Sequence, residues 1–178
     1  MSAIVTFMGR RLMRRLPDQL LAAALMLFCA ARACAGGIEP AGDLRADAKA
    51  SGRDGMPLIV FFSSYSCPYC EQVATLHLEP LIEHGSTVGA VRVREVEIAS
   101  GKTLRDFAGA RMTHAEFADR ENVSVTPVVK FFGPDGAEIA SPLVGYSNAD
   151  FYGDYLDASL RAARSTGWGQ RRDSAPIR

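Results

Sequence analysis

The strongest hydrophobic signal in the chain is the apolar run Leu58–Phe62. Five consecutive apolar residues predict a short strand buried on both faces, of the kind found in a parallel or mixed sheet. Four small or polar residues follow, and then the tetrapeptide Cys67-Pro-Tyr-Cys70 leads into a helical pattern. We expect the rest of the chain to be arranged around this strand–loop–helix unit.

The helix is predicted to begin at Pro68, because proline suits the first helical turn, where its missing N–H is not needed. Pro80 is expected to end or kink the helix, and Gly85 to stop it. His77 lies seven residues after Cys70, on roughly the same face. We interpret His77 as a packed, hydrogen-bonded residue, in preference to a proton donor near the cysteines.

The middle of the chain predicts one strand, a less regular segment and a short helix. Residues 88–98 alternate between apolar and polar and predict a half-buried strand, whereas residues 99–111 indicate a loop or small hairpin. The segment Thr113–Glu116 is a capping box, which starts a helix that ends near Asn122. His114 lies inside the box and is expected to be solvated.

A hairpin and a final helix are predicted next. Residues 123–132 give a strand signal that Pro127 interrupts, which places this proline at a strand's first residue or at an edge. Residues 133–136 form a turn, residues 137–144 pair back as the second strand, and a helix runs over residues 147–164. The apolar side of this helix is expected to contain Phe151, Tyr155, Leu156 and Leu160.

The N-terminus has the pattern of a secretory signal. Four arginines precede the apolar run Leu20–Ala31, and small residues follow it, so we expect residues 1–35 to be a signal peptide cleaved after Ala35. Two alternatives are a lipidated Cys34 and a twin-arginine signal. Translation could also start at Met13.

Composition and charge narrow the classes of function. The chain has 178 residues, of which 48% are hydrophobic, so it can form one domain with a real core. Residues 36–178 keep 15 basic and 19 acidic side chains, because five arginines and one aspartate lie before them. No basic face is apparent, and we expect no nucleic-acid partner.

The domain layout follows from these patterns. Residues 36–55 are predicted to be a linker with a short helix over residues 43–50, capped by Asp43. One domain is expected over residues 56–164, followed by a flexible tail over residues 165–178.

The two cysteines after the leader are placed for redox chemistry. The N–H groups and the dipole at the start of a helix favour a thiolate, so Cys67 should have a pKa below the value of about 8.5 for free cysteine. Cys70 lies one turn further on, within reach for a disulfide. A reversible redox pair is therefore favoured over a permanent disulfide or half of a zinc site. Cleavage of the leader would remove Cys29 and Cys34, which excludes a four-cysteine zinc site.

The chain resembles the thioredoxin superfamily over about residues 40–164. The resemblance rests on Cys67-Pro-Tyr-Cys70 after the first strand and on Thr126-Pro127 before the hairpin. It is closest to secreted bacterial thioredoxin-like proteins of the SoxW type, which are similar in Thr113–Ala118, in Gly145-Tyr146 and in Phe151-Tyr152. It implies an α/β thioredoxin fold, with a central mixed β-sheet flanked by helices and the CxxC motif at a helix N-terminus.

The resemblance also implies roles for individual residues. Cys67 would attack and Cys70 would resolve, while Pro127 would be a cis-proline facing the disulfide. Thr126 would offer backbone groups to a bound peptide, and Pro68 and Tyr69 complete the expected substrate-binding set. No cofactor and no metal are implied. The expected partners are protein thiols and disulfides of the periplasm and a membrane or periplasmic redox partner, and the protein is expected to be a monomer.

The sequence departs from the family at two positions. Thioredoxins usually have a buried aspartate six residues before the first cysteine and a tryptophan directly before it, but here these positions are Phe61 and Ser66. The Pro68-Tyr69 dipeptide is instead that of glutaredoxins.

Two functions remain open from sequence alone. We favour a periplasmic thiol–disulfide oxidoreductase, acting as a reductase, over a thioredoxin-like binding module or copper(I) carrier that uses the same two thiols.

Overall fold

The structure is a computed structural model that describes residues 37–147 and 149–166. Its helices and strands appear in an order close to the predicted one. In chain order, the elements are α2 (Leu44–Arg53), β1 (Leu58–Ser63), α3 (Pro68–Val73), a π-helical segment (Ala74–Leu78), α4 (Glu79–His84), β2 (Arg92–Glu97), β3 (Thr103–Arg105), β4 (Arg111–Thr113), α5 (His114–Arg120), β5 (Val128–Phe132), β6 (Glu138–Val144) and α6 (Ala149–Ser165).

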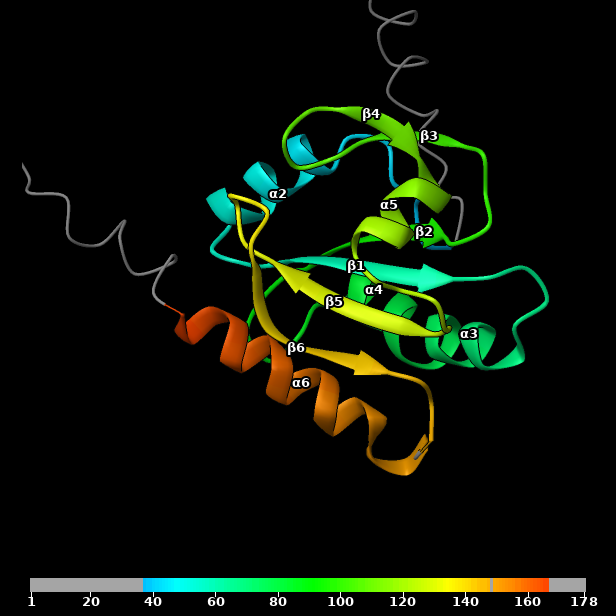
Figure 1. The fold of residues 1–178 in the computed structure, drawn as a ribbon. Coiled ribbons are helices and arrows are strands. Elements are labelled where there is room, and N and C mark those ends of the chain that lie inside the picture. The colour runs from blue at the N-terminus through cyan, green and yellow to red at the C-terminus, as the bar shows by residue number, and fades with distance from the viewer. Residues whose placement is uncertain (1–36, 148, 167–178) are drawn as a thin grey trace, which may run out of the picture. The chain divides into compact units, whose positions relative to one another are not determined.

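The main sheet has four strands in the order β2-β1-β5-β6. Strand β1 pairs in parallel with β2 and antiparallel with β5, and β5 pairs antiparallel with β6 (Figure 1). The five apolar residues of β1 are buried, as predicted, and the strand also includes the buried Ser63, which the sequence analysis assigned to the following break. The sheet is therefore mixed, with the strand that leads to the cysteines among its central strands.

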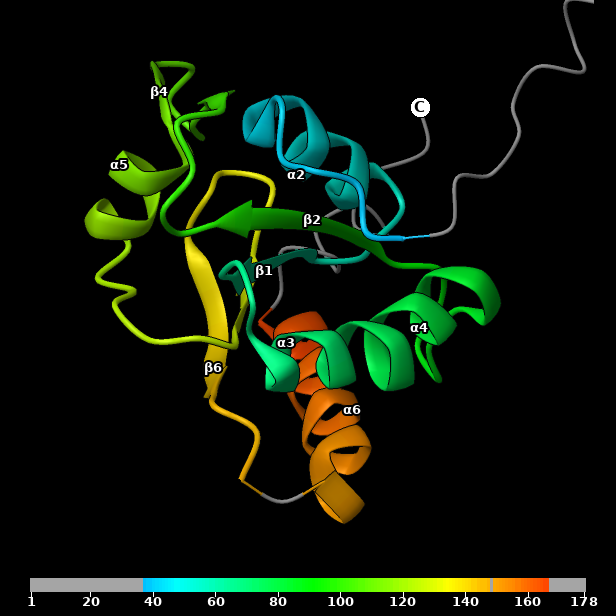
Figure 2. The same ribbon diagram turned by 90° about the vertical axis from the view of Figure 1, so that its right-hand side faces the viewer.

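Helices cover both faces of this sheet, which confirms the predicted α/β architecture. Figure 2 shows α2 and α5 on one side of the strands and α3, α4 and α6 on the other. Alternate residues of β1 supply the two cores: Leu58, Val60 and Phe62 face α2 and α5, whereas Ile59 and Phe61 face the opposite layer. Cys70 belongs to this second core, which ties the redox pair to the sheet.

The helical segment that begins after Cys67 continues through Pro80, and its winding changes from α-helical to π-helical before this proline. Helix α3 passes into the π-helical segment, where Glu79 N–H bonds to Ala74 O, and α4 then carries Pro80 in its first turn. A proline cannot donate the helical hydrogen bond and crowds the preceding turn, so a locally wider winding accommodates it. Gly85, at φ +76°, ends the helix as predicted.

Helix α2 is held in place by a capping residue at its N-terminus and by an ion pair with strand β2. Asp43 caps it, because Ala46 N–H donates to the Asp43 carboxylate at 2.9 Å, as predicted. The Arg94 guanidinium on β2 forms a two-pronged ion pair with Asp47, at 2.8 and 2.9 Å. Both side chains are largely buried, so this pair fixes the direction in which α2 crosses the sheet.

The irregular segment before α5 is a small hairpin made of β3 and β4. The capping box at α5 is present, with Glu116 N–H donating to the Thr113 hydroxyl and the Glu116 carboxylate accepting from Thr113 N–H. The expectation for His114 was wrong, because this residue is only 2% exposed.

Both ring nitrogens of His114 have backbone partners. Nδ1 accepts from Glu97 N–H at 3.3 Å, so the proton lies on Nε2, which donates to Ala41 O at 3.0 Å. The imidazole thereby joins the end of β2 to the segment before α2. Such long-range backbone partners cannot be read from a capping box.

The turn between β5 and β6 forms as predicted, with Gly136 N–H bonding to Gly133 O at 3.0 Å. Gly136 has φ +82°, and a Cβ there would lie 2.4 Å from Phe107 Cβ, so only glycine fits. The predicted apolar side of α6 was partly wrong, because Phe151 and Tyr155 are exposed. The buried side lies about one residue further on and contains Tyr152, Leu156, Leu160 and Ala163.

The predicted signal peptide, most of the predicted tail and Trp168 lie outside the described residues. Within the described residues, no helix has the length and apolar character needed to cross a bilayer.

Candidate active site

The two cysteines form a disulfide at the start of α3. Strand β1 ends at Ser63, and a loop over residues 64–67 follows. Cys67 is the last residue of this loop and directly precedes α3. Cys67 and Cys70 are bonded through sulfur, with their Cα atoms 5.2 Å apart. Cys67 is half-buried whereas Cys70 is only 5% exposed, so the first sulfur is the accessible one. The expected order of attack, Cys67 before Cys70, stays a prediction.

The Cys67 sulfur acts as the N-terminal cap of α3. Cys70 N–H, one of the unpaired amides of the first helical turn, donates to Cys67 Sγ at 3.1 Å. The same amide and the positive end of the helix would stabilise a thiolate at this position once the disulfide is reduced.

A second donor to Cys67 comes from the loop before β5. The Thr126 hydroxyl donates to Cys67 Sγ at 3.6 Å, and the Ser64 hydroxyl lies 2.8 Å from the Thr126 oxygen. The Thr126–Pro127 peptide bond is cis, and Pro127 is buried next to the start of β5. The sequence analysis considered only the backbone of Thr126, so the role of its hydroxyl is new. The distance in sequence, 59 residues, explains why no local pattern could indicate it.

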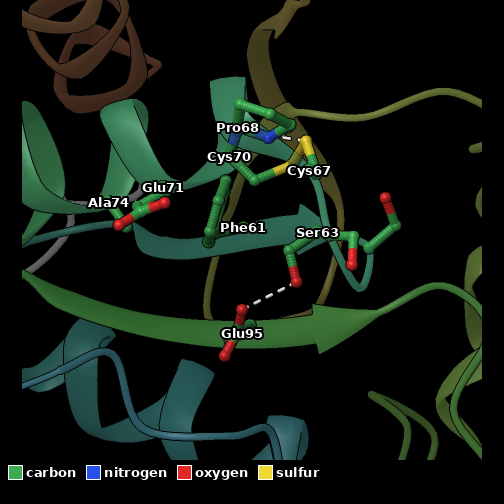
Figure 3. A pocket seen from close by; sticks show the side chains of 10 residues that line it. Phe61, Ser63, Cys67, Pro68, Cys70, Glu71, Ala74 and Glu95 are labelled. Carbon is green, nitrogen blue, oxygen red and sulfur yellow. Dashed lines mark hydrogen bonds between the residues drawn. A yellow bond between two sulfur atoms is a disulfide. The ribbon is translucent and has the colours of Figure 1, made fainter.

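Behind the disulfide lies an open hollow of about 470 Å³. Figure 3 shows the disulfide on one side of it and the Ser63 and Glu95 side chains on the other. The Ser63 hydroxyl donates to the Glu95 carboxylate at 2.7 Å. The hollow is lined by Phe61, Ser63, Ser64, Ser66, Cys67, Pro68, Cys70, Glu71, Ala74 and Glu95. The sequence analysis missed Glu95, which the pairing of β2 with β1 brings close.

Aromatic side chains surround the exposed rim of the site. Pro68 is exposed, Tyr69 is 58% exposed, and Tyr65 in the preceding loop is 90% exposed. The Tyr69 ring also lies 6.4 Å, centroid to centroid, from the ring of Tyr146 after β6. Pro68 and Tyr69 therefore present exposed side chains directly after Cys67 in the chain.

His77 is packed, as the sequence analysis expected. Its Nε2 lies 3.1 Å from the Tyr146 hydroxyl, and its ring lies 4.8 Å from that of Tyr152, centroid to centroid. Burial lowers the pKa of His77 below its ordinary value of 6.5. Burial, and secondarily the neighbouring Tyr146, raises the pKa of Tyr152. His77 thus belongs to an aromatic cluster whose burial favours the neutral imidazole over the charged one.

This cluster predicts a pH dependence of stability. Because the folded state disfavours protonated His77, the unfolded chain binds a proton near pH 6.5 that the folded chain does not. The stability contribution is complete above that pH and decreases as the pH falls through it. We expect His77→Phe to reduce this loss between about pH 6.5 and pH 5, measured as free energy of unfolding in urea. The exposed His84→Gln is the control, and an unchanged pH slope in His77→Phe would contradict the prediction.

The described residues contain no group of three or more histidine, cysteine or acidic side chains that could hold a metal ion. At the cysteine pair, the structure places an accessible sulfur with two hydrogen-bond donors, bonded to a buried sulfur.

Comparisons with known proteins identify the family. The thioredoxin-like domain family matches residues 44–159. Among solved structures, spinach chloroplast thioredoxin f is similar at 15% identity, covering 72% of this chain and 95% of that one, with a TM-score of 0.48. Mitochondrial thioredoxin 3 of Saccharomyces cerevisiae is similar at 18% identity, with 70% and 93% coverage and a TM-score of 0.45.

The C-terminal domain of DsbD from Neisseria meningitidis is similar at 15% identity, covering 67% of this chain and 98% of that one, with a TM-score of 0.45. A search of curated proteins found no match. The family match extends from α2 to α6 and includes both cysteines and Pro127. On that match, the chain belongs to the thioredoxin-like domain family.

Proposed function

We propose that this protein is a thiol–disulfide oxidoreductase that exchanges disulfides with protein substrates through Cys67 and Cys70. The observation that carries the proposal is the asymmetry of the pair. The accessible Cys67 sulfur receives hydrogen bonds from Cys70 N–H and the Thr126 hydroxyl, whereas Cys70 is buried. Donors to one sulfur favour its thiolate, the form that attacks disulfides.

The reaction has two displacement steps. The Cys67 thiolate attacks one sulfur of a substrate disulfide, forming a mixed disulfide while the other substrate sulfur leaves as a thiolate and takes a proton from water. Cys70, as a thiolate, then attacks Cys67 Sγ. The Cys67–Cys70 bond forms, the mixed disulfide breaks, and the second substrate thiol is released. Two electrons pass from the cysteine pair to the substrate, and a dithiol redox partner restores the pair.

The substrate peptide is proposed to bind across the rim around Cys67. The proposed contacts are Thr126 and Pro127, before β5, and Pro68 and Tyr69, which directly follow Cys67 in sequence. The contact of Thr126 with Cys67 Sγ and the exposure of Tyr69 support this placement. A peptide bound there would place its disulfide against the accessible sulfur.

The location and the direction of electron flow are further parts of the proposal. The basic, apolar and small-residue pattern of residues 1–35 supports export to the periplasm. We propose the reductase direction from the resemblance of the sequence to SoxW-type secreted proteins alone. We propose that the protein works as a monomer, without a cofactor or a bound metal.

Export gives a direct prediction about the mature N-terminus. We expect intact-mass measurement of protein from the periplasmic fraction to give a chain beginning at Gly36, because small residues precede that position. Cytoplasmic protein is the control for the uncleaved mass. A chain that begins at Cys34 with added lipid mass, or an uncleaved chain in the periplasm, would contradict the prediction.

Trapping in the periplasm tests the function itself. Cys70→Ser keeps the attacking thiol but removes the resolving one, so mixed disulfides with natural partners should accumulate on Cys67. Mass spectrometry of these adducts would identify the substrates and separate a reductase with few clients from a broad oxidase. The control, Cys67→Ser, should trap little, because its remaining thiol is buried. A copper(I) carrier or an inert binding module would give no specific adduct with either variant.

A further inference from the structure

The second step of the proposed reaction requires a proton acceptor for Cys70. A buried thiol attacks slowly until it loses its proton, and burial alone favours the neutral form. Phe61, on β1 beneath the pair, lies in the same core as Cys70 and has no ionisable group. The acceptor must therefore come from another element that lines the hollow.

Strand β2 brings a carboxylate to this hollow. In the parallel pairing of β1 with β2, Phe61 lies opposite Glu95, so both side chains are on the sheet face that α3 covers. Glu95 is half-buried and lines the same hollow as Cys70 (Figure 3). It thus comes from the neighbouring strand, at the register position next to Phe61.

Ser63 holds the Glu95 side chain in place. Ser63 is only 4% exposed, and its hydroxyl donates to the Glu95 carboxylate at 2.7 Å. This bond uses one lone pair of the carboxylate and leaves others free to accept a proton. The hollow of about 470 Å³ has room for water molecules between Glu95 and Cys70.

Glu71 is the other carboxylate that lines this hollow, but it is exposed on α3. Glu95 also lines an adjoining hollow of about 230 Å³. The titratable groups that line these hollows with Glu95 are the two cysteines and Glu71 in the first and Tyr65, Glu97, Lys102 and His114 in the second. Of the two carboxylates beside Cys70, only Glu95 is half-buried and held by a buried donor.

We propose that Glu95 is the proton acceptor for Cys70, an inference that rests on the proposed function. In the mixed disulfide, the Cys70 thiol gives its proton through water to the Glu95 carboxylate. The Cys70 thiolate attacks Cys67 Sγ, the Cys67–Cys70 bond forms, and the bond from Cys67 to the substrate sulfur breaks. The substrate sulfur leaves as a thiolate and takes up the proton that the Glu95 carboxyl group gives back through water. Glu95 is then ionised again.

Rapid-quench measurement of the two steps tests this role. Reduced protein is mixed at pH 7 with an excess of a synthetic disulfide-linked peptide dimer, quenched with acid, and analysed by intact mass. Formation of the mixed disulfide reports attack by Cys67, and its decay reports attack by Cys70. We compare wild type with Glu95→Gln, which keeps an acceptor for Ser63, and with Glu71→Gln as the matched carboxylate control.

We expect Glu95→Gln to form the mixed disulfide at the wild-type rate but to resolve it about 100-fold more slowly, the low end of what a positioned acid–base group contributes. The defect should shrink at pH values above the roughly 8.5 at which a free cysteine ionises, because hydroxide then removes the proton of the buried Cys70 thiol without Glu95. Glu95→Asp should recover part of the rate, which a merely structural loss would not. Glu71→Gln should resolve at the wild-type rate.

Other outcomes separate the two proposals. Wild-type protein that forms neither a mixed disulfide nor the Cys67–Cys70 disulfide would refute the proposed function. If wild type resolves the mixed disulfide but Glu95→Gln resolves it equally fast, or Glu71→Gln is the slow variant, only the role of Glu95 is overturned. If Glu95→Gln fails to fold, Ser63→Ala tests the same role. Without the Ser63 hydroxyl the Glu95 carboxylate is no longer held in place, so the mixed disulfide should form at the wild-type rate but resolve more slowly.

Discussion

Replacing Cys67 with serine is expected to reduce disulfide exchange to the rate without protein. Cys67 carries the accessible sulfur and receives hydrogen bonds from both Cys70 N–H and Thr126, so no other sulfur of the pair can begin the reaction. Serine is close in size and its oxygen can cap the helix in place of the sulfur, but it is not a nucleophile towards disulfides at neutral pH. The measurement is insulin reduction with dithiothreitol as the electron donor.

The matched variant for this prediction is Cys70→Ser. It should also lose turnover but should show one equivalent of mixed disulfide, because attack still occurs and resolution does not. Substantial turnover by Cys67→Ser would contradict the assignment of roles. Equal trapping by both variants would contradict it as well, while leaving the fold intact.

The second large effect is expected in the core that α5 forms with the sheet. Phe117 is 1% exposed, stacks on Phe62 at a centroid distance of 6.0 Å, and meets the Phe107 ring at 5.9 Å. Phe117→Ala should lower the free energy of unfolding by about 3–5 kcal/mol, from lost burial and the cavity left behind. Urea denaturation of the oxidised protein measures it.

Phe151 provides the control for this substitution. It is also a helical phenylalanine, but on α6 and 52% exposed. Phe151→Ala should change stability by less than about 0.5 kcal/mol, as is usual for surface positions. Equal losses in the two variants would contradict the packing described for α5 and α6.

Local sequence patterns were sufficient to predict most of the fold. The apolar run of β1 predicted a strand buried on both faces, because strands covered on both faces are nearly continuous in apolar residues. Asp43 and the Thr113–Glu116 capping box marked helix starts, because their hydrogen bonds lie within three residues. Position before a helix also placed Cys67 and Cys70 correctly.

Contacts between segments that lie far apart in the chain could not be predicted from local sequence patterns. His114 was expected in solvent, but the positions of β2 and of the segment before α2 bury it. The same holds for the hydroxyl of Thr126 and for Glu95, whose places depend on the sheet register and on the loop before β5. On α6, an offset of one residue separates the predicted apolar side from the buried one, since a helix turns about 100° per residue.

The titration of thiolate absorbance in the reduced protein tests the central claim most directly, namely that Cys67 is the attacking thiolate of the pair. The account predicts a transition well below about pH 8.5, the value for free cysteine, because Cys70 N–H, Thr126 and the start of α3 stabilise the charge. This transition should persist in Cys70→Ser and disappear in Cys67→Ala. A Cys67 transition at or above the value for free cysteine, or a low transition that survives in Cys67→Ala, would contradict the account.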